Sequence, residues 1–208
     1  MLDNEAPVAV CKNITIQLGS GGTAGITTSM VNNGSHDNCA FTLSLSQTSF
    51  NCSHVGANTV ILTATDPGGL THSCNSIVTV QDVTPPVALC KNVSVFLNAA
   101  GQASVTAAQV NNNSSDACGI QSMSVTPNAF TCSNLGANTV TLTVTDVNTN
   151  SATCTATVTV VDNLPPTVAC QNISITLGSN GYASITSPMV FNAAGSSDNC
   201  GTVNPQSV

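Results

Sequence analysis

The chain has 208 residues, of which only 5% are charged, and nine acids against two basic residues give a formal net charge of −7. Two lysines cannot neutralise a nucleic-acid backbone or form a polybasic patch, which excludes a nucleic-acid partner and a basic membrane-binding surface. No apolar run is long enough for a membrane span. Ten cysteines indicate disulfides and an oxidising compartment, so we expect a secreted, extracellular or cell-surface protein.

Three copies of one unit follow each other along the chain. They open with the similar segments AVCKNITI, ALCKNVSV and VACQNISI. This repetition predicts domains at 1–84 and 85–164 and the N-terminal half of a third at 165–208, joined by short proline-containing linkers. We therefore interpret the chain as a piece of a longer array and expect its partners to be neighbouring repeats of that chain.

Each copy has the pattern of short β-strands separated by turns. In the first copy, turn signals occur at 19–22, 32–38 and 66–69. In the second copy, threonine alternates with mostly apolar residues over 139–145 and 153–160, which is the period-two pattern of half-buried strands. The sequence predicts an all-β fold of tandem immunoglobulin-like β-sandwich repeats.

The first strand of the second copy contains a change of parity. Val93, Val95 and Leu97 point to one face of an extended strand, whereas Cys90 points to the other. If all four side chains point inward, a β-bulge or a switch between sheets must fall near residues 91–92.

Each complete copy contains four cysteines, which allow three pairings. If the first and last strands of the sandwich are adjacent and parallel, the first and fourth cysteines meet. The expected pairs are then Cys11–Cys74 and Cys90–Cys154. By elimination, the second and third cysteines form Cys39–Cys52 and Cys118–Cys132. Cys170 and Cys200 in the third copy are expected to lack partners. A cysteine metal site is the rival interpretation, but it lacks paired CxxC spacing.

Several motifs recur together. They are a cysteine followed by N-[IV]-[ST]-[VI], a DN-type loop, the stretch F-x-C-x-x-[VL]-G-A-N-T-V-x-L-T-x-T-D, and a cysteine four residues before V-T-V. Together they resemble the hyalin repeat, an immunoglobulin-like module of extracellular proteins, most specifically at 56–66 and 136–146. The resemblance also implies the first-to-last cysteine pairing, whereas the second pair is not part of the general pattern.

The composition resembles a narrower group. Threonine-, asparagine- and serine-rich tandem copies with almost no lysine are similar to the repetitive surface adhesins of gliding Bacteroidetes-type bacteria. That resemblance implies export by type IX secretion and a part in gliding motility. Animal hyalin-repeat proteins are the other group in which the module occurs.

Eight of the nine acids recur at three positions of the repeat: before the D-x-C cysteine, at the start of the last hairpin and in the linkers. In an immunoglobulin-type path, these positions gather at the N-terminal pole of a domain, where three carboxylates with loop carbonyls suit Ca²⁺. The candidate calcium ligands are Asp3, Asp37, Asp66, Asp82, Asp116 and Asp146. In the alternative interpretation, each aspartate only forms a local turn.

No catalytic constellation recurs. His36, His54 and His72 occur only in the first copy and are interpreted as surface substitutions, so we expect no enzyme and no cofactor other than calcium. The sequence predicts a structural stalk or filament segment of an extracellular repetitive adhesin with an unknown surface or glycan ligand. The alternatives are a glycan- or protein-binding repeat module and an accessory array of a secreted hydrolase.

The third copy supplies only the first strands of a sandwich. The strands that cover the inner face in the first two copies are missing from it, so its apolar side chains are expected to lie exposed. These residues are Ile173, Ile175, Leu177 and Ile185.

Overall fold

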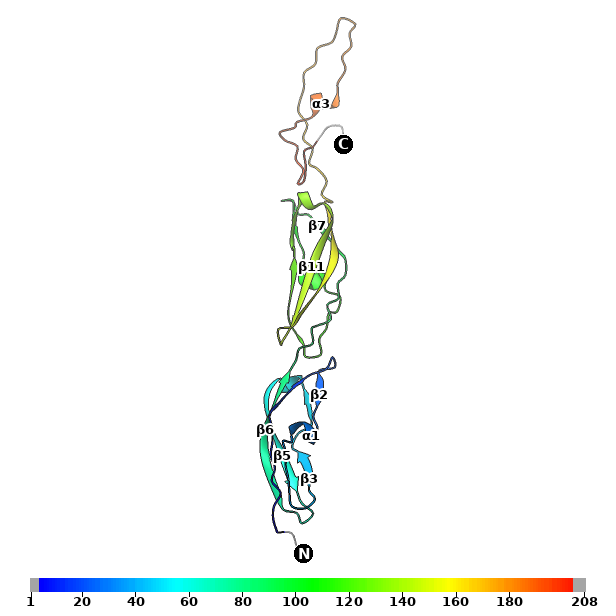
Figure 1. The fold of residues 1–208 in the computed structure, drawn as a ribbon. Coiled ribbons are helices and arrows are strands. Elements are labelled where there is room, and N and C mark those ends of the chain that lie inside the picture. Colours follow the sequence, from blue (N-terminus) through cyan, green and yellow to red (C-terminus); the bar gives the residue numbers. More distant parts are fainter. Residues whose placement is uncertain (1–3, 204–208) are drawn as a thin grey trace. The chain divides into compact units, whose positions relative to one another are not determined.

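The structure, a computed structural model, describes residues 4–203. Within these residues, short β-strands dominate, with three four-residue helical turns and two 3-10 turns between them (Figure 1). The chain divides into two compact units. One contains the residues up to Val87 with 114–122 and 144–152, and the other contains 88–113, 123–143 and the residues from 153 onward.

The first repeat forms a four-stranded sheet and a two-stranded sheet. The larger sheet has the order β1 (Ile14–Gln17), β6 (Thr71–Gln81), β5 (Gly56–Thr65) and β3 (Thr42–Leu45). The smaller sheet pairs β2 (Thr23–Gly25) with β4 (Ser49–Asn51). β1 runs parallel to β6, and the other pairs are antiparallel. The connections contain α1 (Thr28–Val31) and the 3-10 turn η1 (Cys52–His54).

The second repeat has the same topology. Its larger sheet has the order β7 (Val93–Phe96), β12 (Ser151–Val161), β11 (Gly136–Asp146) and β9 (Ile120–Thr126). Its smaller sheet pairs β8 (Gln102–Ser104) with β10 (Ala129–Thr131). α2 (Ala107–Val110) and the 3-10 turn η2 (Cys132–Asn134) occupy the equivalent connections. The prediction of an all-β sandwich fold is confirmed.

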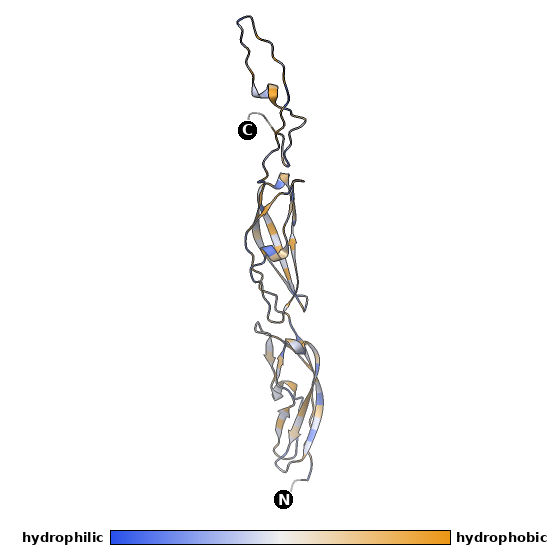
Figure 2. Cartoon of the chain, turned by 180° about the vertical axis from the view of Figure 1, so that it is seen from behind, coloured by the Kyte–Doolittle hydropathy of each residue, from blue (hydrophilic) through white to orange (hydrophobic). Residues whose placement is uncertain are grey.

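The core of each sandwich follows from the alternation along the strands. In β11, Val140, Leu142 and Val144 are fully buried, while the threonines between them are half-buried. Phe50 and Phe130 from the smaller sheets are each 2% exposed and pack into their cores. Hydrophobic and hydrophilic residues accordingly alternate along the strands in Figure 2. Burial of this apolar surface supplies the main stabilisation of each small sandwich.

The parity change in the first strand is a switch between pairing partners. Before it, Cys90 bridges Asn111 in antiparallel fashion, and after it Val93 pairs with Val158 in parallel. At the switch, the side-chain oxygen of Asn92 accepts a hydrogen bond of 2.8 Å from the backbone N–H of Thr157. The expected switch near residues 91–92 is present, and the asparagine of the repeated C-[KQ]-N motif fills the gap in the β-ladder.

The described part of the third repeat contains no β-strand. It has α3 (Ser187–Val190) and two isolated β-bridges, Thr167–Ser197 and Cys170–Phe191. Ile175, Leu177 and Ile185 are 42%, 62% and 57% exposed, as the sequence predicts, whereas Ile173 is half-buried. Across the described residues, the helices are too short to cross a membrane.

Candidate functional site

The cysteine pairing is the main departure from the sequence prediction. Cys11–Cys74 and Cys90–Cys154 form as expected and join the first strand of each sandwich to the last. The predicted pairs Cys39–Cys52 and Cys118–Cys132 are wrong, and so is the expectation that Cys200 lacks a partner. Cys52 is bonded to Cys118, and Cys132 is bonded to Cys200. Each of these bonds joins one repeat to the next.

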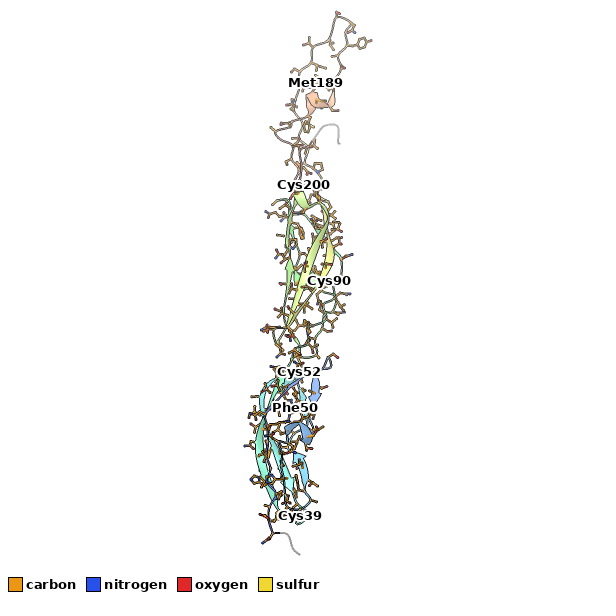
Figure 3. The ribbon with its side chains drawn as sticks, viewed as in Figure 1. Cys39, Phe50, Cys52, Cys90, Met189 and Cys200 are labelled. Carbon is orange, nitrogen blue, oxygen red and sulfur yellow. A yellow bond between two sulfur atoms is a disulfide. The ribbon has the colours of Figure 1, made fainter. Side chains whose placement is uncertain are left out.

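The strand register explains why the second and third cysteines cannot meet within a repeat. Cys39 lies just before β3, whose first residue, Thr42, pairs with Thr65 at the end of β5. Cys52 lies just before the start of β5, where Gly56 pairs with Val80. The length of β5 separates the two cysteines, so they lie at opposite ends of the sandwich (Figure 3). A disulfide needs Cα atoms within about 7 Å, whereas a ten-residue strand spans roughly 30 Å.

The repeated F-x-C-S-x-[VL]-G-A-N-T-V motif fixes the first cysteine of each junction. Cys52 opens η1, whose N-cap residue Asn51 and third residue His54 form a reciprocal capping box. Asn58 of the same motif donates side-chain hydrogen bonds to the carbonyls of His54 and Gly56, at 2.7 and 3.1 Å. The second repeat has the same bonds from Asn138. The most repetitive part of the sequence therefore holds the junction cysteine in place.

The first cysteine of each junction, Cys52 or Cys132, lies against a glycine of the turn after the first strand. Gly22 and Gly101 both have φ of +68°, a conformation that L side chains rarely adopt. A Cβ atom on Gly22 would lie 2.8 Å from Cys52 Sγ and 3.1 Å from Ala117 Cβ. A Cβ atom on Gly101 would lie 2.7 Å from Cys132 Sγ and 2.8 Å from the carbonyl oxygen of Asn199. Only glycine leaves room for the disulfide and the D-x-C loop.

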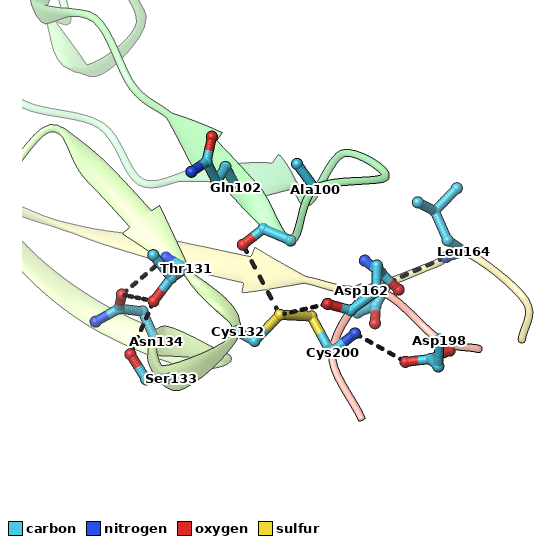
Figure 4. The surroundings of a disulfide bond; sticks show 12 residues. Ala100, Gln102, Thr131, Cys132, Ser133, Asn134, Asp162, Leu164, Asp198 and Cys200 are labelled. Atoms are coloured by element: carbon cyan, nitrogen blue, oxygen red, sulfur yellow. Dashed lines mark hydrogen bonds between the residues drawn. A yellow bond between two sulfur atoms is a disulfide. The ribbon is translucent and has the colours of Figure 1, made fainter. Parts of the chain in front are cut away.

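Beside Cys132–Cys200, the carboxylates of Asp162 and Asp198 accept hydrogen bonds from neighbouring groups (Figure 4). The backbone N–H of Cys200 donates to Asp198 Oδ1 at 2.9 Å, and that of Leu164 donates to Asp162 Oδ1 at 3.2 Å. The amide of Asn199 donates to Asp162 Oδ1 at 3.1 Å and to the carbonyl of Asn98 at 3.3 Å. This amide therefore ties the D-x-C loop to the linker carboxylate.

The Cys52–Cys118 junction has the equivalent disulfide and the equivalent backbone hydrogen bonds to its two aspartates, but it lacks the side-chain amide. Asp82 Oδ1 accepts from the N–H of Thr84 at 3.1 Å, and Asp116 Oδ1 accepts from the N–H of Cys118 at 2.7 Å. Ala117 stands where the second junction has Asn199, so this loop has no side-chain amide at that position. Asp82 is 8% exposed, and its Oδ2 atom is shielded from solvent with no hydrogen-bond partner among the described residues.

The structure brings together two of the six candidate calcium ligands. One carboxylate oxygen of Asp82, one of Asp116 and the Cys118 sulfur lie within 4.8 Å of one another. Asp146 is outside this cluster, and its carboxylate accepts the N–H groups of Asn148 and Asn150 and the Asn150 side-chain amide, all at 2.8 Å. Turn formation therefore accounts for Asp146.

The remaining candidates belong to the first copy. Asp66 Oδ1 accepts from the N–H of Leu70, and Asp37 Oδ1 accepts from the N–H of Asn38, each at 2.8 Å. The Oδ2 atoms of Asp66 and Asp37 are buried and have no hydrogen-bond partner among the described residues. Neither aspartate belongs to a group of three potential metal ligands in that part of the chain. Asp3 lies outside the described residues.

Two of the three histidines have structural contacts that the sequence does not reveal. Nδ1 of His72 accepts the backbone N–H of Ala9 at 2.9 Å, and Nδ1 of His54 accepts that of Asn51 at 3.1 Å. His36 lies 3.3 Å from the carbonyl of Gly34. Each histidine therefore contacts backbone in the fold of the first repeat.

Comparisons with solved structures show similarity to cadherin-type sandwiches at low identity. The chain is similar to human mucin-like protocadherin EC1-2, with 14% identity, a TM-score of 0.39 and coverage of 73% of this chain and 96% of that one. For the protocadherin GammaB4 extracellular domain, the identity is 17%, the TM-score 0.38 and the coverage 82% and 35%. For an endo-fucoidan hydrolase of glycoside hydrolase family 107, the identity is 14% and the TM-score 0.31, with coverage of 76% of this chain and 29% of that one.

No protein-family model matches the chain. No curated protein matches it either. The hyalin-repeat resemblance therefore stays a prediction from the residues that carry it.

Proposed function

We propose that this chain is a structural segment of an extracellular array of immunoglobulin-like repeats, in which disulfides hold each repeat to the next. The repeats at 1–84, 85–164 and 165–208 are its proposed domains, and neighbouring repeats are its main partners. Four disulfides support an oxidising, extracellular location because such bonds persist where thiols are not kept reduced.

The observation that carries this proposal is the overlap of the four disulfide loops. The loops run over 11–74, 52–118, 90–154 and 132–200, and each begins before the previous one ends. Every peptide bond from Cys11 to Cys200 therefore lies inside at least one covalent loop. A single break in this part of the backbone leaves the two sides of the break connected.

The junction disulfides bridge the linkers between repeats, which lie outside the loops closed by the disulfides within the repeats. Cys11–Cys74 and Cys90–Cys154 bridge only the sandwiches, so residues 75–89 lie outside both loops. Within that linker, only Cys52–Cys118 provides a second covalent path, and Cys132–Cys200 does the same for residues 155–169. Such an arrangement suits a chain that must stay continuous under load or proteolysis.

The disulfides within the repeats limit how far a loaded chain can lengthen. Cys11 and Cys74 are separated by 63 positions in the sequence, and their bond takes that stretch out of the covalent path that bears tension. Because an extended chain spans at most about 3.6 Å per residue, the bond withholds roughly 200 Å of extension from an unfolded repeat. A stalk or filament segment requires limited lengthening of this kind.

Membership of a gliding-bacterium adhesin, type IX export and a surface or glycan ligand rest on composition and repeat style. A glycan- or protein-binding module and an accessory array of a secreted hydrolase remain the alternatives. The disulfide overlap favours the structural function because a recognition module needs no second covalent path across its linkers.

Cleavage within the first linker tests the proposal. A site-specific protease sequence is placed at Val83–Thr84, between two disulfide-bonded sandwiches, and the oxidised full chain is cut there. We expect one species on a non-reducing gel and two fragments after reduction. The matched control carries the same sequence with Cys52→Ser and Cys118→Ser and is expected to separate without reductant. Two fragments from the oxidised parent under non-reducing conditions would overturn the proposal.

A further inference from the structure

The first junction contains a buried carboxylate oxygen for which the fold provides no donor. The residue is Asp82, which is 8% exposed, and the atom is Oδ2. Its other oxygen is used by the N–H of Thr84, so the local turn accounts for only half of the carboxylate. Burying an anionic oxygen without a partner is unfavourable, which makes this atom a candidate ligand for a cation.

A second carboxylate lies within reach of the first. Oxygens of Asp82 and Asp116 are within 4.8 Å of each other, and Asp116 is half-buried. Two oxygens bound to one calcium ion at 2.3–2.6 Å can lie at most about 5 Å apart, so a single ion can contact both. The third member of the cluster, Cys118 Sγ, is bonded to Cys52 and is not a ligand, which leaves a set of hard oxygen donors.

At the second junction, a side-chain amide links the linker carboxylate to the D-x-C loop. The Asn199 amide donates to Asp162 Oδ1, the oxygen that also accepts the Leu164 N–H, and Asn199 corresponds to Ala117 in the first junction. The methyl group of Ala117 cannot donate a hydrogen bond. The chain's two lysines, Lys12 and Lys91, lie two residues before the first strands of the sandwiches and outside the D-x-C loops.

We infer that the first junction binds one Ca²⁺ ion through Asp82 and Asp116, and that at the second junction the Asn199 amide makes the link between linker and D-x-C loop that the ion makes at the first. The exposed side of Asp116 leaves room for water to complete the coordination shell, since Ca²⁺ takes six to eight oxygens. The ion would join the linker to the D-x-C loop beside the disulfide. Asp146, which its own turn satisfies, is not a ligand.

Calcium titration of the oxidised full chain tests the inference. The probe is CaCl₂ added to chelator-treated protein, with heat of binding and the midpoint of thermal unfolding as the two readouts. We expect one bound ion per chain and a higher midpoint, because an ion that binds only the folded state stabilises it. Asp116→Asn keeps the acceptor for the Cys118 N–H and removes the charge, so we expect its Kd to rise roughly tenfold or more.

Two further variants separate the ion site from general effects of charge. Asp162→Asn removes the equivalent linker charge at the second junction and is expected to bind calcium as the parent does. Ala117→Asn supplies the missing amide and is expected to weaken binding. Failure of the parent to bind calcium, unchanged binding in Asp116→Asn, or loss of binding in Asp162→Asn would each overturn the inference. All these variants keep every cysteine, so the outcome is separate from that of the linker-cleavage experiment.

Discussion

Each of the two junctions contains a disulfide, but the groups that contact the carboxylate of the linker aspartate differ between them. At Cys132–Cys200, the Asn199 amide and the Leu164 N–H both donate to Asp162 Oδ1. At Cys52–Cys118, Ala117 supplies no amide, Asp82 Oδ1 accepts only the Thr84 N–H, and the buried Oδ2 has no partner among the described residues. The elements around the cysteine are repeated in both: a 3-10 turn, an asparagine that braces it and a glycine that makes room. The covalent connection is therefore common to both junctions, and the neighbouring polar contacts vary.

Removal of the junction disulfides gives the largest expected effect. Cys52→Ser with Cys118→Ser removes a disulfide whose cysteines lie 66 positions apart in the sequence. Cys132→Ser with Cys200→Ser removes one whose cysteines lie 68 positions apart. Chain entropy predicts a loss of about 4 kcal/mol in the free energy of unfolding for either pair. Urea unfolding followed by circular dichroism measures both losses. An unchanged urea midpoint in either double variant would contradict the assigned bond.

Substitution of the junction glycines gives the next largest effect. Gly101→Ala places a Cβ 2.7 Å from Cys132 Sγ and 2.8 Å from a backbone oxygen, so we expect a loss of roughly 3 kcal/mol and slower disulfide formation. Gly22→Ala meets a sulfur and a methyl group, and we expect a somewhat smaller loss. Gly181→Ala is the matched control because that glycine has φ of +75° but no neighbour within 4 Å. Equal losses in all three variants would show that backbone strain alone is responsible.

Exchange of the variable residue between the junctions gives the smallest effect. Asn199→Ala removes the donor to Asp162 and is expected to lower the free energy of unfolding by about 1 kcal/mol in calcium-free buffer. Ala117→Asn supplies a donor to Asp82 and is expected to raise it by a similar amount. Thermal melts of both variants in chelator measure the two changes. Shifts of the same sign would show that the two loops are not equivalent.

The fold could be predicted from the sequence because it depends on local patterns. Alternating Val140, Leu142 and Val144 define a strand with one buried face, and the parity of Cys90 against Val93 locates the switch between sheets. These signals arise from the period of a β-strand and need no knowledge of distant contacts.

Elimination within each repeat gives the wrong junction pairing, because these bonds join successive repeats. The same sequence contains the signal that corrects it. A D-x-C loop before β3 and an F-x-C turn before β5 must lie at opposite poles if those strands are antiparallel, so their cysteines can meet only between successive copies. The calcium candidates share one predicted pole and a recurring position in the repeat. Whether a given aspartate is satisfied depends on the neighbouring side chain, as Ala117 and Asn199 show, and repetition of the acids does not reveal it.

Peptide mapping of the non-reduced protein tests the central claim most directly. Cleavage before aspartate separates the chain into peptides that include 37–65, 116–145 and 198–208, which carry the cysteines in question. The observed pairing predicts that these three peptides are recovered as one disulfide-linked cluster, with 3–36 linked to 66–81 and 82–115 linked to 146–161. Recovery of 37–65 and 116–145 as separate peptides, each with an internal disulfide, would contradict the account.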